Sequence, residues 1–275
     1  MTYFSFLGLF LAIPILIMLG ATWHDWRQGR KMPQHFAIYP AWAILLLHLV
    51  LALVYTTPWD NYLVATSVWW YDPAKVTGIV LGYVPIEEYT FFLVQPILTG
   101  LWLLFWLRRQ PTSVESGWEN GRIRLIALII LGSIWLGMVT ILIMDWKPGT
   151  YLALILAWAL LPIMLQVGFG GDILWQHRRV LLLGLVPITL FLATADALAI
   201  ADGIWTIDPA QSLDWLIGGI LPFEEFLFFL ITNILVLFGM TLFLSVESQQ
   251  RLRKIRVAVN QCQIEKRKPL EKYNG

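Results

Sequence analysis

Long stretches of this chain contain no charged side chain. They run over residues 32–59, 89–107, 125–144, 148–171, 180–195 and 226–246. About 20 apolar residues form a helix long enough to cross the hydrocarbon core of a bilayer, whereas a soluble domain would show amphipathic stripes. Only 13% of the 275 residues are charged, against about 25% in soluble domains. The sequence therefore predicts an all-α integral membrane protein with little soluble mass.

We expect seven membrane-spanning helices with approximate ends. They are placed at residues 3–22, 37–56, 78–107, 125–144, 150–170, 180–200 and 215–245. The first is interpreted as a span and not as a cleaved signal peptide, because no positively charged region precedes it. Cys262 is the only cysteine, so no disulfide can form within the chain, and no Cys/His cluster predicts a metal site.

Lysine and arginine residues gather on one side of the predicted spans. Of the 19 such residues, 17 follow spans one, three, five or seven, and only Lys75 and Lys147 fall on the other side. Because cytoplasmic loops carry the excess of positive charge, we expect the N-terminus outside and the C-terminus in the cytoplasm. The basic tail is interpreted as a stop-transfer and solubility segment, with contact to anionic lipid as the alternative.

One segment of the chain occurs twice. Residues 82–98 (GYVPIEEYTFFLVQPIL) and 219–235 (GILPFEEFLFFLITNIL) are identical at nine of seventeen positions. Five further pairs upstream continue the correspondence: Tyr3/Tyr151, Pro14/Pro162, Asp60/Asp196, Trp69/Trp205 and Asp72/Asp208. Repeated leucine and phenylalanine can arise from composition, but Gly, Pro, Glu and Glu in fixed order twice cannot.

The repeat predicts the topology. Spans one to three correspond to spans five to seven, and the single span between them returns the chain to its starting side. Both three-helix units then enter the membrane in the same direction, as parallel repeats in a 3+1+3 arrangement, and sites in such proteins lie at the repeat interface. We expect a first repeat at residues 1–109, a connecting helix with loops at 110–148, a second repeat at 149–246 and a basic tail at 247–275.

Each repeated segment carries two adjacent glutamates within an apolar span. These are Glu87 and Glu88 in the first copy and Glu224 and Glu225 in the second. Glutamates at a helix start can be simple caps that favour the helix dipole. Ionisable groups inside spans are rare, however, and usually line a cavity or carry protons. Two adjacent carboxyls in a medium of low dielectric cannot both ionise cheaply, so one is expected to stay protonated and available as a general acid.

The residues around the glutamates support this interpretation. Pro85 and Pro222 are expected to kink or start a helix and so turn the pair toward the interior. Neighbouring residues on a helix point about 100° apart, so one glutamate of each pair is expected to face the cavity, without an indication of which. Phe91, Phe92, Phe228 and Phe229 are candidates to line a cavity that stabilises a cation, although packing is the commoner use of such rings. Interface belts are the expected place of six tryptophans: Trp59, Trp69, Trp70, Trp146, Trp205 and Trp215.

The twin Pro-x-Glu-Glu-[Tyr/Phe]-x-Phe-Phe segments on two three-span units resemble the membrane-integral lycopene cyclases. These occur as two small subunits in some bacteria and as one fused chain in archaea and fungi, and this chain resembles the fused form. The resemblance covers both repeats and leaves out the tail. It implies acid-catalysed, non-redox cyclisation of the ψ-ends of a linear carotenoid, with no cofactor or metal and with membrane lipid around the protein. It also implies a bacterial or archaeal cell membrane and contact with other carotenoid-pathway enzymes, and no nucleic acid.

The resemblance assigns roles to residues of this chain. Glu87, Glu88, Glu224 and Glu225 inherit the acid/base role, and Pro85 and Pro222 inherit the shaping role. Asp60 and Asp196 are candidates for proton delivery, although a structural role is the simpler interpretation. His48, which has no counterpart in span six, is interpreted as a packed polar residue with a proton relay as the alternative.

Other function classes are open to the same topology. A proton-coupled transporter of small solutes also uses parallel three-helix repeats, but the motif region offers only Gln95 and Asn233 as amides for a polar solute. A retinal photoreceptor requires a lysine within span seven, which has none. The type of ring formed, the number of ends cyclised, the carotenoid length, the number of active sites and the oligomeric state stay open.

Overall fold

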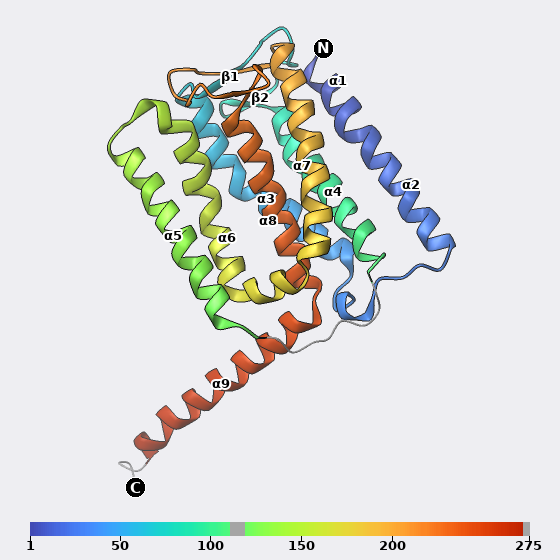
Figure 1. Cartoon of the computed structure of the whole chain (residues 1–275), viewed down its shortest axis with the longest axis vertical. Helices are drawn as coiled ribbons and strands as arrows, with labels where there is room; N and C mark the ends of the chain where they lie inside the picture. Colours follow the sequence, from blue (N-terminus) through green and yellow to red (C-terminus); the bar gives the residue numbers. More distant parts are fainter. Residues whose placement is uncertain (111–118, 272–275) are drawn as a thin grey trace.

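The computed structural model describes residues 1–110 and 119–271, with the backbone alone described for residues 262–271. Part of the predicted connecting segment (111–118), the end of the predicted tail (272–275) and the side chain of Cys262 lie outside this description. The described chain forms a bundle of long helices, with both repeats starting at the same end (Figure 1). The seven apolar helices predicted from the sequence are present, and each is long enough to cross a membrane.

The first three-helix unit begins with the short helix α1 (Tyr3–Leu7), one π-helical turn (Gly8–Ala12) and α2 (Ile13–Arg27), which together make one span. It continues with α3 (Ala41–Ala65) and α4 (Ile86–Leu107). The connecting helix α5 (Gly121–Ile143) has no buried residue and packs on α6. Its amino end is capped by Asn120, whose side chain accepts hydrogen bonds from the backbone of Arg122 and Ile123.

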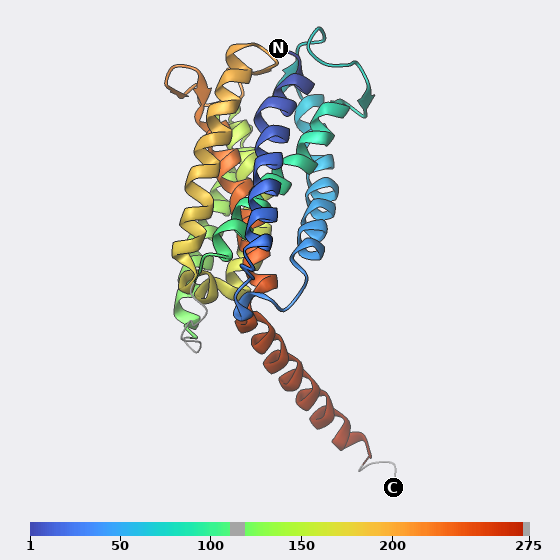
Figure 2. The same ribbon diagram turned by 90° about the vertical axis from the view of Figure 1, so that its right-hand side faces the viewer.

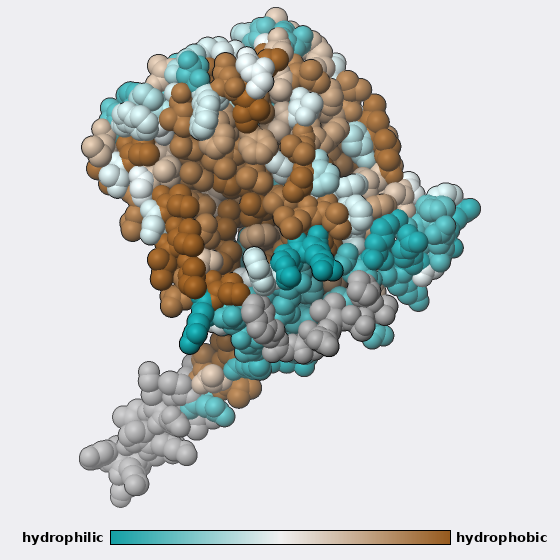
Figure 3. All heavy atoms as spheres, viewed as in Figure 1, coloured by the Kyte–Doolittle hydropathy of each residue, from teal (hydrophilic) through white to brown (hydrophobic). Residues whose placement is uncertain are grey.

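The second unit contains α6 (Thr150–Gln176), α7 (Arg178–Ala201) and α8 (Phe223–Leu244). The final helix, α9 (Val246–Glu271), leaves the bundle at an angle (Figure 2). Short 3-10 turns at Gln34–Phe36 and Lys147–Gly149 precede α3 and α6. On the face shown in Figure 3, apolar side chains cover the middle of the bundle and polar side chains gather toward its ends, as expected for a protein with lipid around its middle.

The contacts between the two units occur in matching pairs of helices, from which we infer an approximate two-fold axis along the bundle. Helices α4 and α8 contact each other at the centre, α3 packs on α8, and α7 packs on α4. At one end of the bundle, β1 (Trp69–Tyr71) pairs antiparallel with β4 (Trp205–Ile207), so that Trp70 faces Thr206. We call this the strand end, and the end from which α9 leaves the tail end.

Two predicted spans begin too early. The apolar residues before α4 and α8 are not helical but form hairpins, β2 (Val80–Leu81) with β3 (Val84–Pro85) and β5 (Leu216–Ile217) with β6 (Leu221–Pro222). The hairpins project on either side of the strand end (Figure 2). A glycine with positive φ turns each of them, Gly82 at 70° and Gly219 at 76°, because this conformation strains other residues.

Candidate functional site

Pro85 and Pro222 stand at the start of a helix, as the N-cap residues of α4 and α8. Of the two predicted alternatives, a kink or a helix start, the structure has the helix start. Both prolines are buried at the ends of their hairpins, and their extended backbone sets the direction in which the first helical turn presents the glutamates.

The second glutamate of each pair faces the interior between the repeats. Glu88 on α4 and Glu225 on α8 line the same buried pocket. The hydroxyl of Tyr3 donates to Glu88 Oε2 at 2.5 Å, and the hydroxyl of Tyr151 donates to Glu225 Oε1 at 2.5 Å. Tyr3 and Tyr151 are themselves a repeat pair, so the two halves of the site are built in the same way.

The first glutamate of each pair points to a loop of its own repeat. Glu87 Oε1 accepts a hydrogen bond from the backbone N–H of Thr77 at 2.6 Å, and Glu224 Oε1 accepts one from Leu213 at 2.7 Å. Neither glutamate lines the pocket. The geometry therefore brings together one glutamate from each predicted pair, and the other two hold the loops that precede the hairpins.

Two aspartates complete a cluster of four carboxyl groups. Asp60 and Asp196, both almost fully buried, line the pocket with Glu88 and Glu225 and interact with them electrostatically. Trp205 Nε1 donates to Asp196 Oδ1 at 3.1 Å, whereas neither oxygen of Asp60 has a hydrogen-bond partner among the described residues. Asp60 was expected beyond the end of its span, but α3 continues past it to Ala65.

Aromatic rings enclose the carboxyl cluster. Phe91, Phe92, Phe228 and Phe229 all line the pocket, and Trp59 stacks on Phe228 with ring centroids 5.8 Å apart. Three of the tryptophans expected in interface belts line it instead: Trp59, Trp69 and Trp205. The other three are 43–67% exposed: Trp70, Trp146 and Trp215.

Tyr71 reaches the pocket from β1. Burial raises the pKa of Tyr71 well above its usual value, and the nearby carboxyl groups add to this effect. Its hydroxyl therefore keeps its proton at neutral pH and can donate a hydrogen bond at the edge of the cluster.

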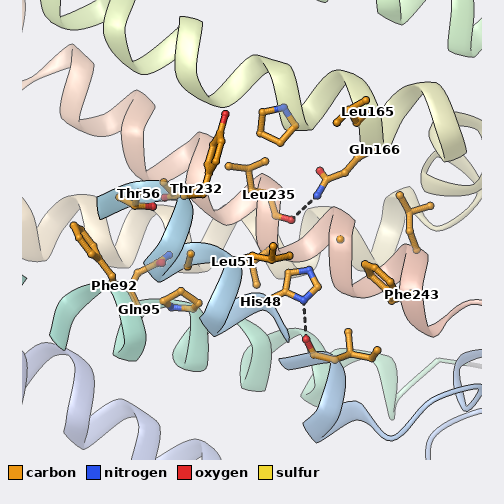
Figure 4. A pocket seen from close by; sticks show the side chains of 18 of the residues that line it. His48, Leu51, Thr56, Phe92, Gln95, Leu165, Gln166, Thr232, Leu235 and Phe243 are labelled. Atoms are coloured by element: carbon orange, nitrogen blue, oxygen red, sulfur yellow. Dashed lines mark hydrogen bonds between the residues drawn. The ribbon is translucent and has the colours of Figure 1, made fainter. Parts of the chain in front are cut away.

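A larger apolar cavity of about 730 Å³ lies next to the pocket of about 40 Å³ that contains the carboxyl groups. Phe91, Phe92 and Phe228 line both and so separate them. The larger cavity continues toward the tail end between α3, α6 and α8, and Figure 4 shows Phe92 and Thr56 at one end and His48 and Phe243 toward the other. A long apolar ligand in this cavity would meet the acidic cluster across a ring of aromatic side chains.

His48 lines this cavity and is 7% exposed. Its Nδ1 lies 2.8 Å from the carbonyl oxygen of Ile44 (Figure 4). Within the described residues, no three His, Cys, Asp or Glu side chains are placed to hold a metal ion together.

At the tail end, two buried aspartates were missed in the sequence. Asp172 on α6 pairs with Arg251 of α9 through both carboxylate oxygens, at 2.8 and 2.7 Å. Asp25 on α2 pairs in the same way with Arg109, at 2.9 Å for each oxygen, and also with Arg108. The signal was present in the sequence as a lone aspartate near the end of the first helix of each repeat.

The lycopene cyclase family model matches residues 1–107 and 148–243, which are the two three-helix units described above. The chain belongs to the lycopene cyclase family. Its relatives include the lycopene beta-cyclase of Halobacterium salinarum, 40% identical over 203 residues that make up 74% of this chain and 83% of the relative. No solved structure matches the chain significantly.

Fungal members of the lycopene cyclase family are longer. The bifunctional lycopene cyclase/phytoene synthase of Podospora anserina is 35% identical over 214 residues, which cover 71% of this chain and 34% of the fungal protein. The protein of the same name from Aspergillus oryzae is 34% identical over 201 residues, with 72% and 34% covered. Membership of the lycopene cyclase family supports a carotenoid cyclase and not the alternative of a solute transporter.

Proposed function

We propose that this cyclase converts the linear ψ-ends of lycopene into β-rings by acid catalysis. The observation that carries the proposal is the buried cluster of Asp60, Glu88, Asp196 and Glu225, contributed by both repeats and separated from a long apolar cavity by aromatic rings. The β-ring follows the name of the archaeal relative, a lycopene beta-cyclase. An apolar polyene fits the cavity, and a buried carboxyl that keeps its proton fits the chemistry.

The reaction is an isomerisation in which every proton returns. A carboxylic acid donates its proton to the terminal double bond of the ψ-end, which leaves a tertiary carbocation and a carboxylate. The next suitably placed double bond attacks this cation, a carbon–carbon bond closes the six-membered ring, and the positive charge moves onto a ring carbon. A carboxylate then removes a neighbouring ring proton, and its electron pair forms the ring double bond. No electron is gained or lost overall.

We assign the acid and the base to Glu88 and Glu225, which face the interior from α4 and α8. Tyr3 and Tyr151 hold these carboxyls in position through their hydrogen bonds. Asp60 and Asp196 return the proton between turnovers, because they line the same small pocket as both glutamates. The faces of Phe91, Phe92, Phe228 and Phe229 stabilise the passing carbocation.

Glu87 and Glu224 act indirectly in this assignment, since their carboxylates bind loop backbone and not the pocket. Pro85 and Pro222 shape the site by starting α4 and α8 at the correct position. We further propose that residues 1–109 and 149–246 are two cyclase half-units, joined by residues 110–148 and followed by a tail from residue 247.

We propose a bacterial or archaeal cell membrane, with the strand end outside and the tail end in the cytoplasm. The distribution of charge supports this, because Lys75 and Lys147 are the only lysines or arginines toward the strand end among the residues that the structure describes. The names of the fungal relatives combine a lycopene cyclase with a phytoene synthase. We therefore expect the chain to work beside other enzymes of carotenoid synthesis and to be surrounded by membrane lipid.

Pigment analysis tests the function. The chain is expressed in bacteria that accumulate lycopene, the pigments are extracted, and the carotenoids are resolved by chromatography with absorbance detection. Pigments with β-rings are expected, and their spectra identify the ring type. Unchanged lycopene, with the protein found in the membrane, would contradict the proposal, and rings of another isomer would contradict the β-ring assignment.

A further inference from the structure

The cavity that we assign to the polyene lies on one side of the approximate two-fold axis. It lies between α3 of the first repeat and α6 of the second, with α8 along its length. Phe228 and Phe243 of α8 both line it, and at a rise of 1.5 Å per residue these positions lie about 22 Å apart along the helix. A polyene in this cavity therefore lies along the bundle, with one end near the carboxyl cluster.

The two-fold axis relates α3, α6 and α8 to α7, α2 and α4. The region that corresponds to the cavity therefore lies between α2 and α7, along α4. The offset that pairs Glu88 with Glu225 also pairs positions 102, 105 and 106 of α4 with positions 239, 242 and 243 of α8. On α8 these positions are Gly239, Leu242 and Phe243, and all three line the cavity.

On α4 the same three positions carry large aromatic side chains. Trp102 stacks on Phe105 with ring centroids 5.7 Å apart, and Trp106 packs edge-on against Phe105 at 5.6 Å. Trp102 Nε1 also donates to the carbonyl oxygen of Leu183 on α7 at 3.1 Å. This hydrogen bond holds the indole across the gap between α4 and α7.

On α3 and α7, the helices that face α8 and α4, the difference in side-chain size is reversed. The offset that pairs Asp60 with Asp196 also pairs His48 of α3 with Gly184 of α7. His48 stands beside Gly239, where a Cβ atom would overlap the imidazole ring. On the cavity side, a histidine on α3 (His48) lies beside a glycine on α8 (Gly239). The related positions hold a glycine on α7 (Gly184) and a tryptophan on α4 (Trp102).

The two ends of the cavity also differ. The carboxyl cluster lies beyond Phe91, Phe92 and Phe228 at the strand end, whereas Ser248, Gln249 and Leu252 of α9 line the cavity at the tail end. Among the described residues, none of those that line the cavity is acidic. A substrate therefore meets the acid with one of its two ends only.

We propose that the cyclase has a single polyene channel, on the α3/α6 side, and closes one end group per binding event. The Trp102–Phe105–Trp106 stack fills the related position on the α2/α7 side. A dicyclic product then requires that the monocyclic pigment leaves the channel and binds again in the reverse direction. This proposal rests on the cyclase activity proposed above.

The opening between α3 and α6 provides a route for this exchange. Leu51 and Leu165 line the cavity and are 50% and 76% exposed on the outer surface of the bundle. Toward the strand end, the Tyr55 hydroxyl donates to the Trp158 carbonyl oxygen at 2.9 Å and the two rings stack. The pigment can leave sideways into the membrane below this contact without the bundle coming apart.

The single channel is tested by introducing the residues of the filled α2/α7 side at the related positions of the open α3/α6 side. The double variant His48→Gly/Gly239→Trp places on the α3/α8 side the residues found at the related positions, Gly184 of α7 and Trp102 of α4. We expect at least a ten-fold loss of cyclic pigment at an equal amount of protein in the membrane. The matched variant Trp102→Leu should cyclise within two-fold of the unmodified chain. Full activity of the double variant, or an equal loss in Trp102→Leu, would overturn the single channel.

A time course on the unmodified chain tests the same proposal and does not depend on whether a variant folds correctly. Membranes with limiting enzyme receive excess lycopene, and pigments are separated at intervals. Monocyclic pigment should accumulate first, and the lag before dicyclic pigment should lengthen as the ratio of lycopene to enzyme rises. Dicyclic pigment from the first turnovers, without free monocyclic pigment, would overturn the proposal. A complete absence of cyclic pigment would instead contradict the cyclase activity itself.

Discussion

The hydroxyl of Tyr3 donates a 2.5 Å hydrogen bond to Glu88 across 85 positions of sequence. The N-terminal turn of the first helix thereby holds a carboxyl at the start of the third helix of the same repeat. Tyr151 and Glu225 repeat the contact in the second unit. Each tyrosine–glutamate contact therefore forms within its own repeat, and the two repeats meet where α4 contacts α8.

The distinction between the two glutamates of a pair gives the first prediction. Glu88→Gln removes an exchangeable carboxyl proton from the pocket and should lower the rate of cyclisation at least 100-fold, the usual scale of general acid catalysis. Glu225→Gln should do the same. Pigment formation is measured against the amount of protein in isolated membranes.

The matched controls are Glu87→Gln and Glu224→Gln. A glutamine oxygen can still accept the hydrogen bond from the backbone of Thr77 or Leu213 that the carboxylate accepts now. These variants should keep activity within about three-fold, because both side chains lie outside the pocket and the hydrogen bond to the loop backbone is retained, although weakened. Equal losses in all four variants would contradict the assignment.

Tyr3→Phe gives a second prediction. It removes the hydroxyl that positions Glu88 but leaves the ring, which packs 5.0 Å from Trp205 between centroids. A hydrogen bond between neutral groups contributes about 1 kcal/mol, so we expect a loss of about five-fold or more in turnover with little change in the amount of protein in the membrane. Tyr151→Phe should behave alike, and Tyr83→Phe, on an exposed hairpin residue, serves as the control. Unchanged turnover in both pocket variants would show that the hydroxyls have no role in positioning.

The sequence was sufficient to predict the spans and their 3+1+3 repeat, because charge-free length and a repeated Pro-x-Glu-Glu motif are local signals. It could not choose between Glu87 and Glu88, since that depends on the angle at which α4 starts after the β2–β3 hairpin. The same hairpin made a predicted span too long, because its apolar residues resemble a helix in composition. Trp69 and Trp205 were assigned to the membrane interface, and only the pairing of β1 with β4 brings them to the pocket.

The pairing of Asp172 with Arg251 predicts that α9 contributes to stability. Asp172 is fully buried, and removal of Arg251 would leave its carboxylate with the backbone N–H of Asn120 at 3.0 Å and Arg124 at 3.8 Å, so we expect a cost of about 1–3 kcal/mol, below that of an uncompensated buried charge. Arg251→Gln should therefore lower the melting temperature of the detergent-solubilised protein by several degrees. Arg253→Gln, on an exposed position of the same helix, should leave it unchanged. Equal melting temperatures for both variants would show that the contact contributes little.

The orientation in the membrane gives a last prediction, tested with the single cysteine of the chain. Cys262 belongs to α9 at the tail end, which we place in the cytoplasm. A thiol reagent that cannot cross membranes should therefore leave Cys262 unlabelled in intact cells and label it after lysis. Ala74→Cys in a Cys262→Ser background puts the thiol on an exposed residue of the strand end and should be labelled in intact cells. Labelling of Cys262 in intact cells, with Ala74→Cys protected, would reverse the orientation and place the carboxyl cluster near the cytoplasmic face.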